Sequence, residues 1–93
     1  MIYYVYLIVS KNNNRLVSYV GYTNNLKKRV NLHNASKGAK FTKGRLWKLA
    51  YFEKYKTKSD ALKQEYKLKK DYNLRLRIKK NYINNENIST SSI

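Results

Sequence analysis

Apolar residues dominate the first ten positions of the chain and are sparse at its far end. Residues 2–9 (IYYVYLIV) are all aliphatic or aromatic. A run of this length without polar alternation is typical of a strand that is buried on both faces. Residues 10–14 are polar and predict a turn, and residues 16–20 predict a partner strand. The chain is therefore expected to begin with a β-hairpin.

Helical spacing follows the hairpin. Leu26 and Val30 lie four residues apart within residues 24–34, and Thr23 is a suitable N-cap, so we predict a helix over residues 24–34. Residues 35–45 (ASKGAKFTKGR) are small and basic and contain two glycines. This composition predicts a cationic loop.

The second half of the chain also changes from strand to helix. Residues 46–55 (LWKLAYFEKY) are rich in aromatic residues and predict a third strand beside the hairpin. Residues 57–60 (TKSD) are suited to cap a helix over about residues 60–71. Residues 72–82 suit either a further short helix or a strand. The predicted order is β-β-α-β-α, with a further α if the last segment is helical, which is an α+β fold.

The end of the chain has little to bury. Residues 83–93 are mainly Asn and Ser, and we expect them to form a disordered tail. The remaining residues, 1–82, are expected to form one domain, because a chain of 93 residues has room for a single core.

Charge narrows the range of functions. The chain has 21 Lys and Arg residues against 5 Asp and Glu, for a formal net charge of +16. A polyanion is the expected partner of such a protein, and nucleic acid is the commonest one. A ribosomal or packaging protein would explain the charge equally well.

Other compositional features exclude several kinds of protein. No apolar run approaches the ~20 residues that a membrane span requires. The chain has no cysteine, which excludes disulfides and thiolate metal sites. No export signal precedes Tyr3. We therefore expect a soluble protein without a membrane partner, located inside the cell in the cytoplasm or the nucleoid or nucleus.

Five residues are candidates for chemistry: Tyr6, Tyr19, Arg29, His33 and Glu65. The predicted hairpin brings the two tyrosines onto neighbouring strands, and it ends at Gly21, where a missing Cβ allows another group to approach the backbone. Arg29 and His33 are one helical turn apart and share a helix face. Each has an ordinary alternative, a solvated arginine or a capping histidine.

Glu65 lies on the side of its predicted helix that packs inward. It follows Ala61 by four residues and precedes Leu68 by three. A carboxylate on an apolar face is costly unless it is paired or binds a metal. Two interpretations stay open: a buried salt bridge with a Lys or Arg, or a metal ligand.

These residues occur in an order that resembles the GIY-YIG nucleases, in particular their small single-domain, YhbQ-like members. Residues 4–6 (YVY) stand where the family has Gly-Ile-Tyr, and residues 19–21 (YVG) stand for Tyr-Ile-Gly. Residues 21–30 (GYTNNLKKRV) resemble the helix entry that carries the family's arginine. Residues 33–42 resemble the loop of the small members, and residues 61–66 (ALKQEY) their acidic helix. The resemblance covers about residues 2–80.

The resemblance implies a three-stranded antiparallel sheet flanked by helices. It also implies hydrolysis of nucleic-acid phosphodiesters with one divalent cation, Mg²⁺ or Mn²⁺. By the same resemblance Tyr6 and Tyr19 surround the attacking water, Arg29 stabilises the phosphate, and Glu65 binds the metal. His33 takes a position that the family fills with Tyr or His.

The chemistry of these groups agrees with such a reaction. Mg²⁺ prefers oxygen ligands and keeps several waters, so one carboxylate together with the substrate phosphate suffices. Tyr19 is favoured as the general base with Tyr6 as its hydrogen-bonding partner. The reverse assignment and His33 remain alternatives, the latter because its pKa is naturally near neutrality.

Six basic residues are candidates for gripping the substrate backbone, and Phe41 for stacking: Lys27, Lys28, Lys37, Lys40, Lys43 and Arg45. The sequence predicts an endonuclease acting on DNA, selective for structure or strand, with a role in repair, recombination or mobile-element processing. A protein partner would supply further targeting. One alternative is a catalytically inactive nucleic-acid-binding module on the same fold, and another is an RNA-binding accessory protein whose aromatic strands stack bases.

Overall fold

The computed structural model describes the backbone of residues 1–91 and the side chains of residues 1–85. Its elements are β1 (Tyr3–Asn12), β2 (Arg15–Thr23), α1 (Leu26–Asn34), the 3-10 turn η1 (Lys40–Thr42), β3 (Lys48–Tyr55), α2 (Lys58–Lys70) and α3 (Tyr72–Ser91). The strands form one antiparallel sheet in the order β2-β1-β3. The predicted α+β class and the predicted order are confirmed, and the last segment is a helix.

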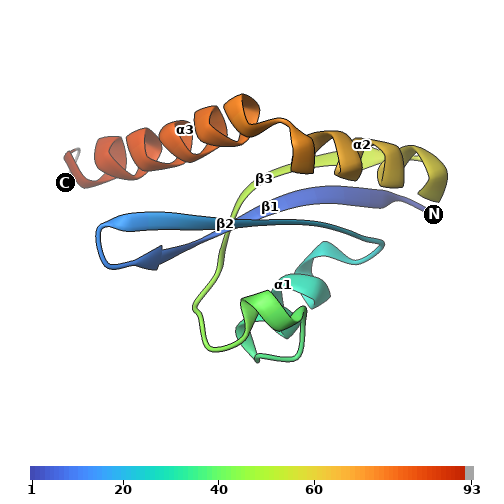
Figure 1. Ribbon diagram of the computed structural model, residues 1–93, viewed down its shortest axis with the longest axis horizontal. Coiled ribbons are helices and arrows are strands. Elements are labelled where there is room, and N and C mark those ends of the chain that lie inside the picture. The colour runs from blue at the N-terminus through green and yellow to red at the C-terminus, as the bar shows by residue number, and fades with distance from the viewer. Residues whose placement is uncertain (92–93) are drawn as a thin grey trace.

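The sheet is covered on both faces, so the molecule has three layers (Figure 1). Helices α2 and α3 lie along one face, and α1 with η1 lies on the other. Alternate residues of β1 serve the two layers. Val5, Leu7 and Val9 pack under α2 and α3, whereas Tyr6 and Ile8 pack on the α1 side. This confirms the prediction that the first strand is buried on both faces.

The cap of α1 differs from the prediction. The N-cap is Asn25, whose side-chain oxygen accepts a hydrogen bond from the Lys28 N–H at 3.1 Å. Thr23 still belongs to β2 and accepts the Asn25 N–H instead, at 3.1 Å. The helix therefore begins two residues later than predicted, because the strand continues past Gly21.

The third strand also begins two residues late. The backbone N–H of Trp47 donates to the side chain of Asn34, and the Trp47 carbonyl accepts from the same side chain at 3.0 Å. Since both backbone groups are used by α1, residue 47 does not join the sheet. The predicted cap of α2 is confirmed in Thr57, which accepts the Asp60 N–H at 3.1 Å.

Helix α3 settles the ambiguity of residues 72–82. Leu74 and Ile78, four residues apart, both pack against the core under the sheet. We expected a disordered tail from residue 83, but the backbone of residues 83–91 continues the helix that begins at residue 72. A helix that has already formed is extended at little further cost. Residues 92–93 lie outside the described part. The domain boundary after residue 82 stays a prediction.

Within the described residues, no helix combines the length and the apolar character that a membrane crossing requires.

Candidate active site

The hydroxyl of Tyr6 is the centre of the site. Tyr6 of β1 lies directly opposite Gly21 of β2. A Cβ atom on Gly21 would overlap the Tyr6 hydroxyl and would lie 2.6 Å from the ring carbon that bears it. The Tyr6 ring therefore passes over Gly21, and its hydroxyl reaches β2, which is an edge strand of the sheet.

His33 holds the Tyr6 hydroxyl from the α1 layer. The Tyr6 oxygen lies 2.7 Å from His33 Nε2, and His33 Nδ1 lies 2.9 Å from Thr42 Oγ1. The Thr42 hydroxyl has one proton and donates it to the Ala39 carbonyl at 2.8 Å. Thr42 must therefore accept from His33, so that Nδ1 carries the imidazole proton. Nε2 of the neutral ring is then an acceptor, and Tyr6 is the donor to it.

The ionisation behaviour of both groups supports this assignment. Burial lowers the pKa of His33 below its usual 6.5, and the positive charge of Arg29 lowers it further. Burial raises the pKa of Tyr6 above its usual 10.0. Arg29 opposes that rise by hydrogen bonding and by its charge, whereas Tyr19 and Glu65 add to it. At neutral pH the imidazole is therefore uncharged and the Tyr6 phenol is protonated.

Tyr19 lies beside this pair on the same face of the sheet. It is opposite Ile8 in the β1–β2 register, two residues along from Tyr6. Its ring meets the His33 ring edge-on, with 5.3 Å between centroids. Tyr6 and His33 are almost completely buried, at 1% and 0% exposure, but Tyr19 is half-buried. Tyr19 is therefore the member of this trio that solvent reaches.

Arg29 and Glu65 lie on helices that cover opposite faces of the sheet. Arg29 is on α1, one turn before His33, and Glu65 is on α2. The charges of both residues act on the Tyr6 phenol. The structure thus places His33 in contact with both Tyr6 and Tyr19, whereas Arg29 and Glu65 affect the pKa of the Tyr6 phenol through their charges.

The ion-pair interpretation of Glu65 also has support. Its carboxylate lies 3.6 Å from the ammonium group of Lys69, one turn later on α2. The Glu65 side chain is only 16% exposed and that of Lys69 is 50% exposed. Because the Lys69 end is open to solvent, such a pair contributes about 0–1 kcal/mol, so the pair alone does not explain why the Glu65 carboxylate is shielded.

Two residues of the site were not predicted. Thr42 is fully buried and orients His33 as described above. Gly38 lies against the His33 ring, because a Cβ there would overlap Nδ1 and would lie 2.8 Å from Cε1. Both belong to the segment that we interpreted as a cationic loop. The motif resemblance over residues 33–42 was the one signal that pointed to them.

Aromatic residues cover the open side of the site. Phe41 stacks on Tyr19 with 6.2 Å between centroids and an angle of 19° between the ring planes. The indole N–H of Trp47 donates to the Thr42 carbonyl at 2.9 Å. Phe41 itself is half exposed, so it forms the outer wall of the site.

The six predicted basic residues lie around the α1 layer. Lys27, Lys28 and Lys37 line a shallow hollow on the outer side of α1. Lys40 begins η1 and Lys43 follows it. The guanidinium of Arg45 lies over the Phe41 ring, 5.4 Å from its centroid. They surround the layer that holds His33, although none is hydrogen-bonded to the central five residues among the described contacts.

Comparison with known proteins gives consistent matches. The model of the GIY-YIG catalytic domain matches residues 2–87. A UPF0213 protein of Staphylococcus haemolyticus is 44% identical over 68 residues, covering 72% of this chain and 79% of that protein. The UPF0213 protein YazA of Bacillus subtilis is 44% identical over 69 residues, covering 73% and 67% of the two chains.

A solved structure is also similar. The solution NMR structure of the UPF0213 protein BH0048 from Bacillus halodurans has 30% sequence identity and a TM-score of 0.46, covering 84% of this chain and 82% of that chain. The family resemblance that the sequence motifs indicated is confirmed by the match over residues 2–87.

Proposed function

The chain belongs to the GIY-YIG family, and from this premise we propose that it is a metal-dependent endonuclease that hydrolyses phosphodiester bonds of DNA, selecting substrates by structure or strand. One observation carries the proposal. The Tyr6 hydroxyl is hydrogen-bonded to His33, and its pKa is affected by the charges of Arg29 and Glu65. A base, a cation and a carboxylate around one phenol are the groups that this hydrolysis requires.

Solvent exposure suggests how the phenols divide the work. An attacking water must contact its base, and Tyr19 is the more accessible of the two phenols. Tyr19 therefore takes the proton of the water in our proposal. Tyr6, held by His33, orients Tyr19 and the water. Ionising a phenol at pH 7 costs roughly 4 kcal/mol, a cost that neighbouring cations reduce.

Arg29 and Glu65 act on the substrate phosphate. Arg29 would bind a non-bridging oxygen and balance the negative charge that builds on the phosphate during attack. Glu65 would hold one Mg²⁺ or Mn²⁺, and the donor set fits such an ion, since a single shielded carboxylate with open coordination for water and phosphate is sufficient. When bound, the ion supplies Lewis-acid activation of the phosphate.

The test compares cutting with binding. Supercoiled, branched and single-stranded DNA are incubated with Mg²⁺, with Mn²⁺ or with chelator. We expect cutting to require metal and to be abolished by Glu65→Gln and by Arg29→Ala. Glu65→Gln should still bind DNA in chelator.

Lys69→Ala is the matched control, because it removes the ion-pair partner of Glu65 and leaves the carboxylate. If Glu65 serves only that ion pair, Lys69→Ala and Glu65→Gln will have equal effects. If Glu65 binds metal, Lys69→Ala will keep cutting. Tight binding without cutting on every substrate would favour the inactive binding module instead.

A further inference from the structure

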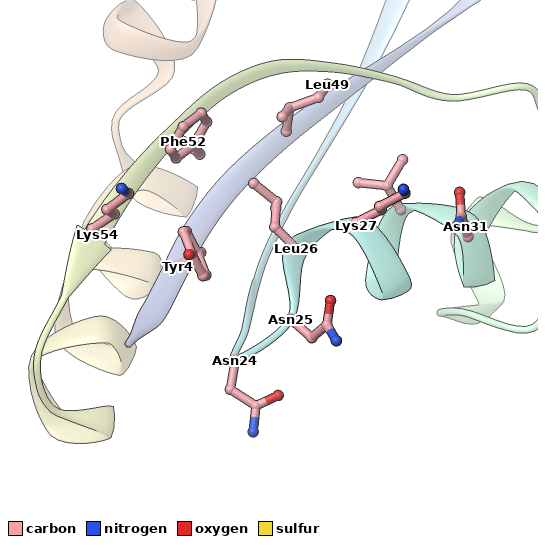
Figure 2. Close-up of a pocket in the computed structure, with 10 residues that line it drawn as sticks. Tyr4, Asn24, Asn25, Leu26, Lys27, Asn31, Leu49, Phe52 and Lys54 are labelled. Atoms are coloured by element: carbon pink, nitrogen blue, oxygen red, sulfur yellow. The ribbon is translucent and has the colours of Figure 1, made fainter. Parts of the chain in front are cut away.

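An open groove lies beside the Tyr6 site rather than at it. It has a volume of about 650 Å³ and lies between α1 and the β1–β3 part of the sheet (Figure 2). Two aromatic residues, two lysines, three asparagines and three aliphatic residues line it, and none of these lining residues is acidic. This composition is unlike a purely apolar docking groove, because it combines flat rings with cations.

Two rings form one wall of the groove. Tyr4 and Phe52 meet edge-to-face with 6.0 Å between centroids, and Figure 2 shows Leu26 of α1 across the hollow from them. Phe52 is 44% exposed, so part of its ring is open to the groove. We name this hollow the Tyr4/Phe52 groove.

An irregularity in β3 creates this wall. The register shifts between Leu7 and Ile8 of β1, so that Leu49 is opposite Ile8 and Phe52 is opposite Tyr6. In a regular strand, residues 49 and 52 would point to opposite faces. The extra residue of the bulge turns both side chains to the α1 face, where they line the groove.

Positive charge flanks the rings. Lys54 is directly opposite Tyr4 in the β1–β3 register, and Lys27 lies across the groove in the first turn of α1. An apolar peptide would cover the rings but leave both ammonium groups without a counter-charge. A nucleotide unit satisfies both features, since its base stacks on an aromatic ring and its phosphate meets a lysine. Asparagine amides at the rim can pair with base edges.

The groove continues the proposed active site along β1. Tyr4 and Tyr6 share a face and are two residues apart, which is about 7 Å along a strand. A nucleotide strand with its reacting phosphate near Tyr6 would therefore bring a neighbouring base to the groove. Within a duplex the neighbouring pairs cover the faces of each base, so an internal base can stack on a side chain only where the strand is unpaired.

Resting on the proposed nuclease function, we propose that the Tyr4/Phe52 groove binds one unpaired nucleobase and its phosphate, so that the enzyme selects nucleic acid with a single-stranded segment next to the cut. Phe52 provides the stacking surface, and Lys54 and Lys27 bind the phosphate.

The test measures binding in chelator, so that cutting plays no part. Fluorescence anisotropy compares labelled dT and rU oligonucleotides with a blunt duplex. Phe52→Ala should weaken single-strand binding by about 5- to 150-fold, the range expected for the stacking of one base, and duplex binding by less than about 2-fold. Phe52→Tyr keeps a ring and should bind like the wild type. The dT and rU arms show whether the sugar matters.

Matched controls exclude general effects of aromatic or charge loss. Tyr66 is 62% exposed on α2 and, like Phe52, has a lysine beside it, so Tyr66→Ala should leave single-strand binding unchanged. Lys54→Ala should weaken binding more than Lys63→Ala, which removes the same charge from the exposed surface of α2. Thermal melting checks that each variant is folded.

The outcomes separate this inference from the nuclease proposal. Equal losses for single strand and duplex, or equal effects of Phe52→Ala and Tyr66→Ala, would overturn the groove even if cutting dependent on Glu65 is observed. Phe52-dependent binding of single strands without cutting in any metal would support the groove while the nuclease proposal fails.

Discussion

Replacing Thr42 with valine tests the hydrogen-bond chain at the centre of the site. The side chains are nearly the same size, so the change removes a hydroxyl without leaving a cavity. That hydroxyl accepts from His33 Nδ1 at 2.9 Å and donates to the Ala39 carbonyl at 2.8 Å. Thr42 and His33 are both 0% exposed, so water does not replace the lost partner.

The expected loss of stability follows from these two contacts. Leaving a buried donor without a partner costs about 1–3 kcal/mol, and an ordinary hydrogen bond contributes about 0.5–1.5 kcal/mol. We expect Thr42→Val to lower the free energy of unfolding by about 2 to 4 kcal/mol. At about 4–8 °C per kcal/mol for a domain of this size, Tm should fall by roughly 10 to 30 °C.

Thr42→Ser is the matched control. It keeps the hydroxyl and loses one methyl group, for about 1 kcal/mol. Urea and thermal denaturation measure all three proteins. Equal stabilities of Thr42→Val and Thr42→Ser would show that the hydroxyl does not hold His33 in the way described.

A second readout reports the tautomer itself. His33 is the only histidine of the chain, so ¹⁵N NMR of the imidazole needs no assignment among several rings. The wild type should show a protonated Nδ1 and a bare Nε2 at neutral pH. Thr42→Val should shift the ring toward protonation at Nε2, because Nδ1 has lost its acceptor. A wild-type ring protonated at Nε2 would contradict the assignment of Tyr6 as donor.

Three further predictions concern the same layer. Gly21→Ala should destabilise the fold by about 1–3 kcal/mol and displace the Tyr6 ring, measurable by urea denaturation and by the Tyr6 ring NMR signals. Gly38→Ala should shift the His33 signals and lower Tm, and unchanged signals would refute the close contact. Folding lowers the pKa of His33, so below about pH 6.5 the unfolded chain binds more protons than the folded protein does. The stability that is present above that pH is therefore lost as pH falls, at up to about 1.4 kcal/mol per pH unit. His33→Asn should remove this slope in urea titrations between about pH 6.5 and 5; a slope that persists would assign it elsewhere.

Local patterns predicted the parts of the fold that local physics decides. The apolar run of residues 2–9 has apolar side chains on both faces of its strand, and these can be buried only if a layer covers each face. β1 is buried in this way. Thr57 caps α2 as predicted, since capping depends on neighbours three residues away. The predicted start of α1 was wrong. Both Thr23 and Asn25 can cap a helix, and the length of β2 decided between them.

The support of the site was beyond prediction for a different reason. Thr42 and Gly38 contact His33 only because the loop after α1 folds back, and Trp47 fixes that path by binding Asn34 and the Thr42 carbonyl. These are contacts between side chains and backbone that no periodicity encodes. Charge patterning likewise indicated a cationic loop without indicating that its small residues face inward.

The position of Gly21 explains how the Tyr6 hydroxyl reaches the edge strand of the sheet. A sheet normally separates the side chains of its two faces, and α2 packs on β1 and β2 from the face opposite α1. The Tyr6 hydroxyl passes over Gly21 to the edge strand, and the charges of Arg29 on α1 and Glu65 on α2 both affect its pKa. A side chain at residue 21 would push the hydroxyl back from this edge. The last residue of the second tripeptide therefore leaves room for the phenol at this edge of the sheet.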